Sequence, residues 1–221
     1  MPPMQTPDDT AKTDTTCTPR TRGRPRVFDR EAALAQAMRI FWLKGYEATS
    51  LTDLTEAMGI RSPSLYAAFG SKEALYAEAL RHYASTYETI GWNEFYTATT
   101  AREAILAWLR GAAAFLSGSL TDTPRGCMVT LSTVANEGHK ELGELVQQAR
   151  SVPFERVKAR ITLAISDGEI PASVDPHALA RFVQAVQNGM SILARDGASQ
   201  AELEAVVEVA MLGWDARTRA Q

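Results

Sequence analysis

The sequence predicts an all-α protein. Apolar residues recur at intervals of three and four over most of the chain, which is the spacing of one face of a helix. Capping residues and glycines divide these stretches into segments of helical length. From residue 84 onward we find neither strand alternation nor an internal repeat. We therefore expect about nine helices, in a small N-terminal domain with a helix-turn-helix and a larger helical C-terminal domain.

Composition limits the class of protein. The 221 residues allow one large or two small domains, and the hydrophobic content of 45% and charged content of 22% are ordinary for a soluble globular protein. No apolar run approaches the roughly 20 residues of a membrane span, and the N-terminus lacks the apolar core of a signal peptide. We expect a cytoplasmic protein with no membrane partner. Cys17 and Cys127 lie far apart and do not suggest a disulfide framework.

Positive charge is concentrated near the N-terminus. The net charge is −3, yet residues 20–83 hold ten Lys/Arg against seven Asp/Glu. Residues 1–19, rich in Thr, Pro and Asp, are expected to be a disordered tail. The basic arm that follows contains Arg22, Arg24 and Arg26 in the order Arg-Gly-Arg-Pro-Arg, which is similar to the core of an AT-hook. Such arginines suit the narrow minor groove of DNA, although a solubilising basic tail is the plainer interpretation.

Two helices are expected before residue 59. Asp29 can cap a helix that runs to about Lys44 and ends at a glycine. Ser50, with Asp53 three residues later, is in the register of a capping box. The helix that follows should end at Gly59, because a glycine adopts left-handed backbone at little cost.

A second short helix follows the turn at Ile60. Ser62 is expected to cap this helix, with Pro63 at its first position, and Gly70-Ser71 should end it and cap the next. Two short helices joined by a tight turn are a helix-turn-helix pattern, although an ordinary helical hairpin is the alternative. The second helix of such a motif can present its first turn to base edges in the major groove. That first turn carries Arg61, Ser62, Pro63 and Ser64.

The motif resembles the DNA-binding domain of TetR-like transcriptional regulators. The resemblance covers Phe28 to about Tyr83. It rests on the order Thr49-Ser50-Leu51, Ile60, Ser64-Leu65-Tyr66, Phe69 and Ser71-Lys72-Glu73. It implies phosphate contacts from Tyr66 and Lys72. Thr49, Ser50 and Thr52 stand at a helix N-terminus whose hydroxyls and free N–H groups suit a phosphate, although plain capping is the alternative. Many members carry aromatic or His residues where this chain has Ala67 and Ala68, so its grip on the DNA backbone should depend more on other groups.

The remaining chain is expected to be helical throughout. A helix from Ser71 should reach about Thr89, and 91–100 should form a mixed connection before the C-terminal helices. We place these helices, with a possible kink or break at Pro153, at about 101–118, 127–135, 140–166, 175–197 and 199–214. The division is then 1–19 tail, 20–83 basic arm and DNA-binding domain, and 84–221 effector-binding and dimerisation domain.

The resemblance also implies how the C-terminal half works. The last two helices have small and apolar residues on more than one face, and in TetR-like proteins these helices pair with those of a second subunit. A homodimer would present two recognition helices to a pseudo-palindromic site on double-stranded DNA. The resemblance further implies a small-molecule effector. Plain core is the simpler interpretation of each single residue, but the candidates for the lining of its pocket are Trp108, Phe115, Cys127, Met128, Leu131, Phe154 and Phe182.

Cys127 is also a candidate sensor of oxidants or electrophiles. It follows Arg125 at an expected helix start, and a helix N-terminus and a nearby cation both lower the pKa of a thiol. The alternative is a small buried hydrophobic residue. The identity of the effector stays open at this point.

Catalysis finds little support in the sequence. We see no Gly-rich phosphate loop, no zinc motif and no Cys pair at metal spacing, so no metal or cofactor is expected and the protein is not expected to be an enzyme. The predicted function is a sequence-specific DNA-binding transcriptional regulator, and a repressor released by a small molecule is favoured. An architectural DNA binder that uses only the Arg-Gly-Arg-Pro arm is the main alternative, and a helical carrier or enzyme is a weaker one.

Overall fold

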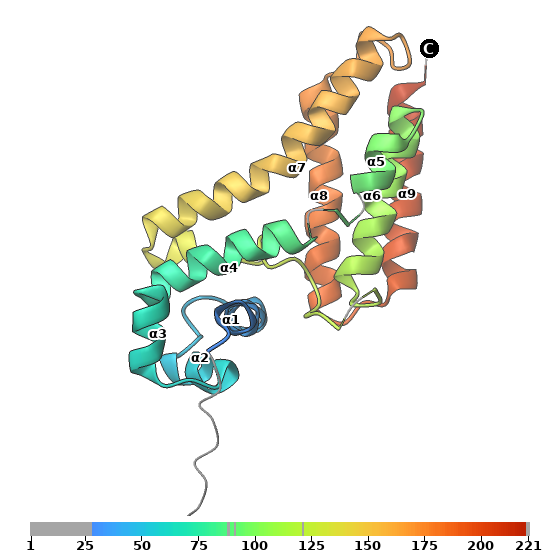
Figure 1. Cartoon of the computed structure of the whole chain (residues 1–221). Helices are drawn as coiled ribbons and strands as arrows, with labels where there is room; N and C mark the ends of the chain where they lie inside the picture. The colour runs from blue at the N-terminus through green and yellow to red at the C-terminus, as the bar shows by residue number, and fades with distance from the viewer. Residues whose placement is uncertain (1–27, 88, 91, 121, 220–221) are drawn as a thin grey trace, which may run out of the picture.

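The computed structural model describes residues 28–87, 89–90, 92–120 and 122–219. Across these ranges the chain forms nine α-helices, one short 3-10 helix and no strand (Figure 1). The α-helices are α1 Arg30–Lys44, α2 Leu51–Met58, α3 Ser62–Phe69, α4 Lys72–Tyr87, α5 Trp92–Thr97, α6 Ala101–Leu116, α7 Lys140–Ser166, α8 Pro176–Arg195 and α9 Gln200–Thr218. The all-α prediction is confirmed.

The first three helices form a small unit whose ends are set by local signals. Asp29 accepts a hydrogen bond from the Ala32 N–H at 3.0 Å and so caps α1. Gly45 has φ +81 and its N–H donates to the Phe41 carbonyl, which ends the helix. Gly59 has φ +65 and ψ +31, the left-handed conformation expected after α2. These short-range contacts fix the angles at which α1, α2 and α3 meet.

Helix α4 links this unit to the rest of the chain. It packs along α1 and against α7, and its buried side chains Leu75, Tyr76 and Tyr83 complete the core of the N-terminal unit. In Figure 1, α6, α8 and α9 stand side by side as a bundle, while α7 runs obliquely from the region of α4 to the far end of α8. The C-terminal core therefore lies between α6, α7, α8 and α9.

Two expectations for the helices need correction. The segment 127–135 is not a helix: it forms turns and leads into the 3-10 helix η1, Val134–Glu137. The Arg150 guanidinium donates hydrogen bonds to the carbonyls of Val129, Thr130 and Ser132, so an open segment is held where a helix was expected. Residues 92–97 of the expected connection form the helix α5. Helix α7 continues through Pro153 as one element.

Candidate nucleic-acid interface and ligand cavity

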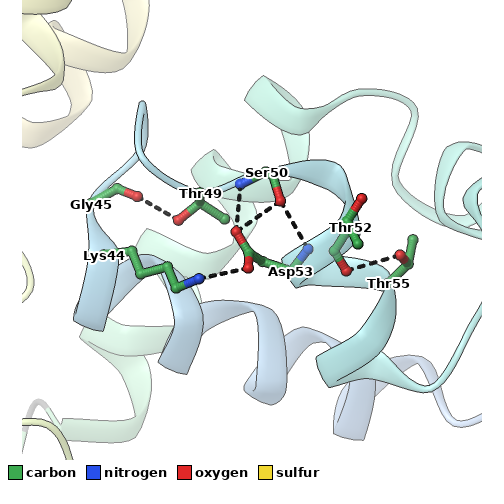
Figure 2. A network of polar contacts seen from close by, with 7 residues as sticks. All are labelled: Lys44, Gly45, Thr49, Ser50, Thr52, Asp53 and Thr55. Carbon is green, nitrogen blue, oxygen red and sulfur yellow. Dashed lines mark hydrogen bonds and ion pairs between the residues drawn. The ribbon is translucent and has the colours of Figure 1, made fainter.

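The N-terminus of α2 is held by a complete capping box (Figure 2). The Ser50 Oγ accepts from the Asp53 N–H at 3.0 Å, while Asp53 Oδ2 accepts from the Ser50 N–H at 2.9 Å and from its hydroxyl at 2.8 Å. Lys44 Nζ lies 2.6 Å from Asp53 Oδ1. Chiefly through Lys44, and through Ser50, the pKa of Asp53 is lowered to about 2. The carboxylate is thus ionised and tied to both helices at neutral pH.

The same helix end leaves backbone donors for a phosphate. In an α-helix the first N–H groups have no partner within the helix, and the capping box satisfies those of Ser50 and Asp53 only. The N–H groups of Leu51 and Thr52 remain available as donors, and the Thr52 side chain is exposed. Thr49 differs, because its side chain is 1% exposed and its hydroxyl donates to the Gly45 carbonyl at 2.6 Å. Thr49 supports the turn, so its side chain is poorly placed to reach DNA.

Helix α3 buries one face and presents the other. Leu65 is fully buried and Phe69 nearly so, which fixes the rotation of the helix on the core. The first turn, with Arg61, Ser62 and Ser64, is exposed, and Pro63 in that turn is exposed too. The Arg61 side chain has no hydrogen bond or ion pair to any residue that the structure describes. The first turn of α3 is therefore free to contact another molecule.

The start of α3 differs by one residue from the expectation. Arg61, rather than Ser62, is the N-cap residue, and its side chain makes no capping hydrogen bond. Ser62 is the first helical residue, so Pro63 occupies the second position, where its missing N–H is equally harmless. The shift leaves the Ser62 hydroxyl at the exposed end of the helix instead of committed to a cap.

The remaining candidates for DNA contact lie in three places. Tyr66 is 46% exposed on α3, next to the first turn. Lys72 is half-buried at the start of α4, with its Nζ 4.3 Å above the ring of Tyr46. That cation–π contact holds the ammonium near the same face as α3. Arg22, Arg24 and Arg26 fall outside the described residues.

A cavity of about 370 Å³ lies in the C-terminal half, within the range of small-molecule sites. Its lining comes from α4, α5, α6, α7, α8 and the segment around residue 127. Three predicted residues line it: Trp108, Phe115 and Cys127. Burial raises the pKa of Tyr83 well above its usual value, and its hydroxyl donates to the Cys127 Sγ at 3.3 Å. That thiol is therefore an acceptor inside the cavity wall.

Four other predicted residues do not line this cavity. Met128 and Leu131 line a smaller hollow of about 350 Å³ beside the end of α1. Phe154 turns instead toward α8, with its ring 5.1 Å from that of His177 and under the Arg181 guanidinium at 3.7 Å. Phe182 is 40% exposed on α8. Their positions follow from how each helix is rotated in the bundle, which the spacing of apolar residues does not specify.

Several lining residues were missed by the sequence reasoning. They include Tyr83 and Tyr87 on α4, Trp92 on α5, and Gln184, Gln187 and Asn188 on α8. The spacing of Tyr83 and Tyr87 by four residues indicates a shared helix face, which was the one available signal. The polar residues of α8 carried no signal of their own, because amides at helical spacing are common on solvated faces.

Two kinds of site are absent from the part of the chain that the structure describes. No group of three or more His, Cys, Asp or Glu is placed to hold a metal ion. None of the helices in the described ranges is both long and apolar enough to cross a membrane.

An exposed first turn on α3, a capped α2 and a cavity between the C-terminal helices define the class of a helix-turn-helix DNA-binding protein with a ligand-sized pocket. Residues 33–79 match the family described as bacterial regulatory proteins, tetR family. The chain is 35% identical over 205 residues to the HTH-type transcriptional repressor ComR of Escherichia coli K12, covering 92% of this chain and 97% of ComR. Over 67 residues, 30% of this chain and 34% of the relative, it is 46% identical to the repressor BdcR of the same organism.

Solved structures agree with these relatives. A cysteine mutant of the TetR family transcriptional regulator CifR, complexed with 26-bp double-strand operator DNA, superposes with a TM-score of 0.80 at 39% identity, over 87% of this chain and all of that one. The chain belongs to the TetR family of bacterial regulatory proteins. It is a sequence-specific DNA-binding transcriptional regulator.

Proposed function

We propose that this regulator is a homodimeric repressor that a small molecule releases from its operator. The single observation that carries the DNA-binding part is the orientation of α3, which buries Leu65 and Phe69 and presents its first turn. In this proposal Arg61, Ser62, Pro63 and Ser64 meet base edges in the major groove. The repressor assignment is supported by ComR and BdcR, whose names describe transcriptional repressors.

Phosphate contacts are proposed on both sides of that turn. The N–H groups of Leu51 and Thr52 would hold one phosphate at the start of α2, helped by the hydroxyl of Thr52, while Ser50, whose hydroxyl donates to Asp53, would act by fixing this helix end. Tyr66 and Lys72 would hold others, and Thr49 would act by keeping the turn in place. The arm with Arg22, Arg24 and Arg26 would add minor-groove contacts. Residues 20–83 would form the DNA-binding part and 84–221 the part that binds effector and partner subunit.

The homodimer is proposed to form through α8 and α9. Their exposed surface carries large apolar side chains, and in α9 Val209 is 69% and Leu212 70% exposed. On α8, Ile192 and Leu193 are also exposed, at 53% and 44%. Contiguous apolar surface of this kind marks an interaction site, because burying it against a second copy removes it from water. A two-fold axis between these helices would present two α3 helices to a pseudo-palindromic operator.

The effector is proposed to bind the 370 Å³ cavity, whose wall touches α1 through Trp42. The indole ring lies 4.9 Å from that of Tyr83 and 5.8 Å from that of Phe115, and both of these residues line the cavity. The indole N–H also donates to the Gly126 carbonyl at 3.0 Å, next to Cys127. A ligand that shifts this wall would therefore shift α1. Such a shift weakens DNA binding only if the ligand binds the displaced arrangement more tightly.

The test of DNA binding is fluorescence anisotropy of the full chain with DNA from just upstream of its own gene, and with a scrambled fragment, over a salt series. We expect a preference of about 10³ or more for the native fragment. Arg61→Ala should cost about 1–3 kcal/mol of that preference. Arg110→Ala, an exposed arginine on α6, is the control. Equal binding to both fragments, unchanged by Arg61→Ala, would instead support the architectural role of the arm.

The test of the dimer is sedimentation velocity of the double variant Val209→Glu and Leu212→Glu. Placing carboxylates at the centre of the proposed interface should shift the protein to a monomer and lower its affinity for the native fragment. Leu163→Glu, on α7 and 53% exposed, places a carboxylate on an exposed apolar position outside this face and should leave the mass of the assembly unchanged. A double variant that remains a dimer would reject α8 and α9 as the interface.

A further inference from the structure

One part of the wall of the larger cavity is aromatic. Tyr83, Tyr87, Trp92, Trp108 and Phe115 all line it. The ring centroids of Tyr83 and Tyr87 are 5.2 Å apart, those of Tyr87 and Phe115 5.1 Å, and those of Trp92 and Trp108 5.2 Å. Aromatic pairs at such separations gain energy beyond the burial of area. A flat aromatic ligand would extend this set of contacts, whereas a saturated ligand of equal size would gain burial only.

Another part of the wall is polar and uncharged. Thr130, Gln187 and Asn188 line the cavity. The Thr130 hydroxyl donates to Asn188 Oδ1 at 3.3 Å, which leaves the amide nitrogen of Asn188 as a donor. Gln187 is half-buried, and its side-chain amide makes no hydrogen bond to any described residue. A ligand that covers this amide favours binding only if it supplies a hydrogen bond in place of water.

A backbone acceptor adds to this polar part. Ala149 and Pro153 of α7 both line the cavity. Proline has no N–H, so the Ala149 carbonyl lacks its usual helical donor four residues later. The wall thus offers a carbonyl suited to an O–H or N–H group of a ligand.

The charges of the lining are already engaged. Nε and Nη2 of Arg150 donate to three backbone carbonyls of the segment 129–132. The Arg156 guanidinium lies 4.9 Å from the centroid of the Trp92 ring and also has a partner elsewhere. No Asp or Glu occurs among the described lining residues. A cation would therefore lose hydration without gaining a counter-ion, and an anion would have to compete with the contacts that both guanidiniums already make, so an uncharged ligand is favoured.

We propose that the cavity takes an uncharged, flat aromatic molecule that carries a hydroxyl, N–H or amide group. The rings of α4, α5 and α6 hold its aromatic part, and Gln187, Asn188 and the Ala149 carbonyl bind its polar group. This inference rests on the proposed effector role of the cavity and narrows it to one chemical class.

Isothermal titration calorimetry of the full chain tests the class with probes that share one ring system. The probes are 2-naphthol, the anion 2-naphthoate, the cation 2-naphthylmethylammonium and the saturated decahydro-2-naphthol. We expect 2-naphthol to bind at least about tenfold more tightly than each of the others. Binding of either charged probe as tight as that of 2-naphthol would overturn the inference, and so would equal binding of the saturated alcohol.

Two variants test whether the probe binds in the cavity. Gln187→Leu keeps a side chain of similar size without its amide and should weaken 2-naphthol binding about three- to tenfold, while naphthalene itself is unaffected. Gln147→Leu, exposed on α7 outside the cavity, is the matched control. Ala112→Phe, which fills the cavity from α6, should abolish binding while circular dichroism and DNA binding report the fold. Unchanged 2-naphthol affinity in both Gln187→Leu and Ala112→Phe would reject the site.

DNA anisotropy in the presence of 2-naphthol separates this inference from the proposed function. Intact DNA binding with no preference among the probes would reject the ligand class and leave the regulator intact. Tight binding of 2-naphthol at the cavity without any change in DNA affinity would support the class of ligand and reject its role in release.

Discussion

The proposed DNA-reading surface and the cavity are built in opposite ways. The surface comes from one continuous stretch, from Ser50 to Lys72, and near neighbours in the sequence set its ends through a capping box at Ser50 and a left-handed glycine at Gly59, while the buried Leu65 anchors it on the core. The cavity is assembled mainly from six segments that span residues 83 to 188 of the chain. A locally encoded surface keeps a fixed shape, whereas a cavity between separate helices can change when any of them moves. This contrast suits the ligand-controlled regulator that we propose.

The largest effect is expected from a substitution that disturbs only the packing of α3. Leu65→Ala leaves a void beneath α3 and should cost about 2–5 kcal/mol of the free energy of unfolding, measured by urea denaturation. The α3 surface should lose its orientation, so affinity for the native DNA fragment should fall sharply. Leu163→Ala, at an exposed position on α7, should change stability by less than about 0.5 kcal/mol. Full DNA affinity in Leu65→Ala would show that the orientation of α3 does not depend on this anchor.

A smaller effect is expected where the two regions meet. The Arg195 guanidinium of α8 donates to the carbonyls of Trp42, Leu43 and Arg125. Arg195→Met keeps an apolar stem but removes the donors, and should cost about 1–3 kcal/mol of stability because these carbonyls lose their partners. It should also reduce the change in DNA affinity caused by a cavity ligand. The matched control is Arg110→Met, and an undiminished ligand response in Arg195→Met would exclude this contact from the coupling.

The smallest expected effect concerns the pH dependence of the capping box. The pKa of Asp53 in the folded chain is about 2, below its ordinary value of 3.8. The lowered pKa means that ionised Asp53 stabilises the fold fully above pH 3.8, and that this contribution is lost as the pH falls toward 2. NMR titration of the carboxyl carbon should find this pKa, and Lys44→Met should raise it, while Lys158→Met should not. An Asp53 that titrates at its ordinary pKa in the parent chain would contradict the capping geometry.

The same contrast explains what the sequence could predict. The helix-end signals act over only three or four residues, so the sequence alone predicts them. The structure confirms the roles of Asp29, of Ser50 with Asp53, and of Gly59. The segment 127–135 was wrongly predicted as a helix because Arg150, about 20 residues away, holds its carbonyls. Thr49 is buried because the preceding turn folds back on it, which no motif spacing reveals.

The cavity was only partly predictable for a related reason. Trp108 and Phe115 lie on the same face of α6, and both line the cavity. Phe154 instead faces α8. Apolar periodicity tells which face of a helix is buried, but the tilt and rotation of α7 against α8 decide what that face meets. Gln187 lines the cavity although its type is typical of a solvated face.

The Arg195 contacts affect whether the N-terminal unit of this protein could be joined to the C-terminal half of another regulator. The last carbonyls of a helix need donors from outside it, and two of those in α1 are supplied by a side chain more than 150 residues later in the chain. The DNA-reading unit is therefore not a self-contained cassette. A chimera that joined residues 28–87 to a foreign ligand-binding half would retain its capping box and its reading helix. It would still end α1 with two unpaired carbonyls and an indole facing a surface made for another protein, unless counterparts of Arg195 and Gly126 were transplanted with it.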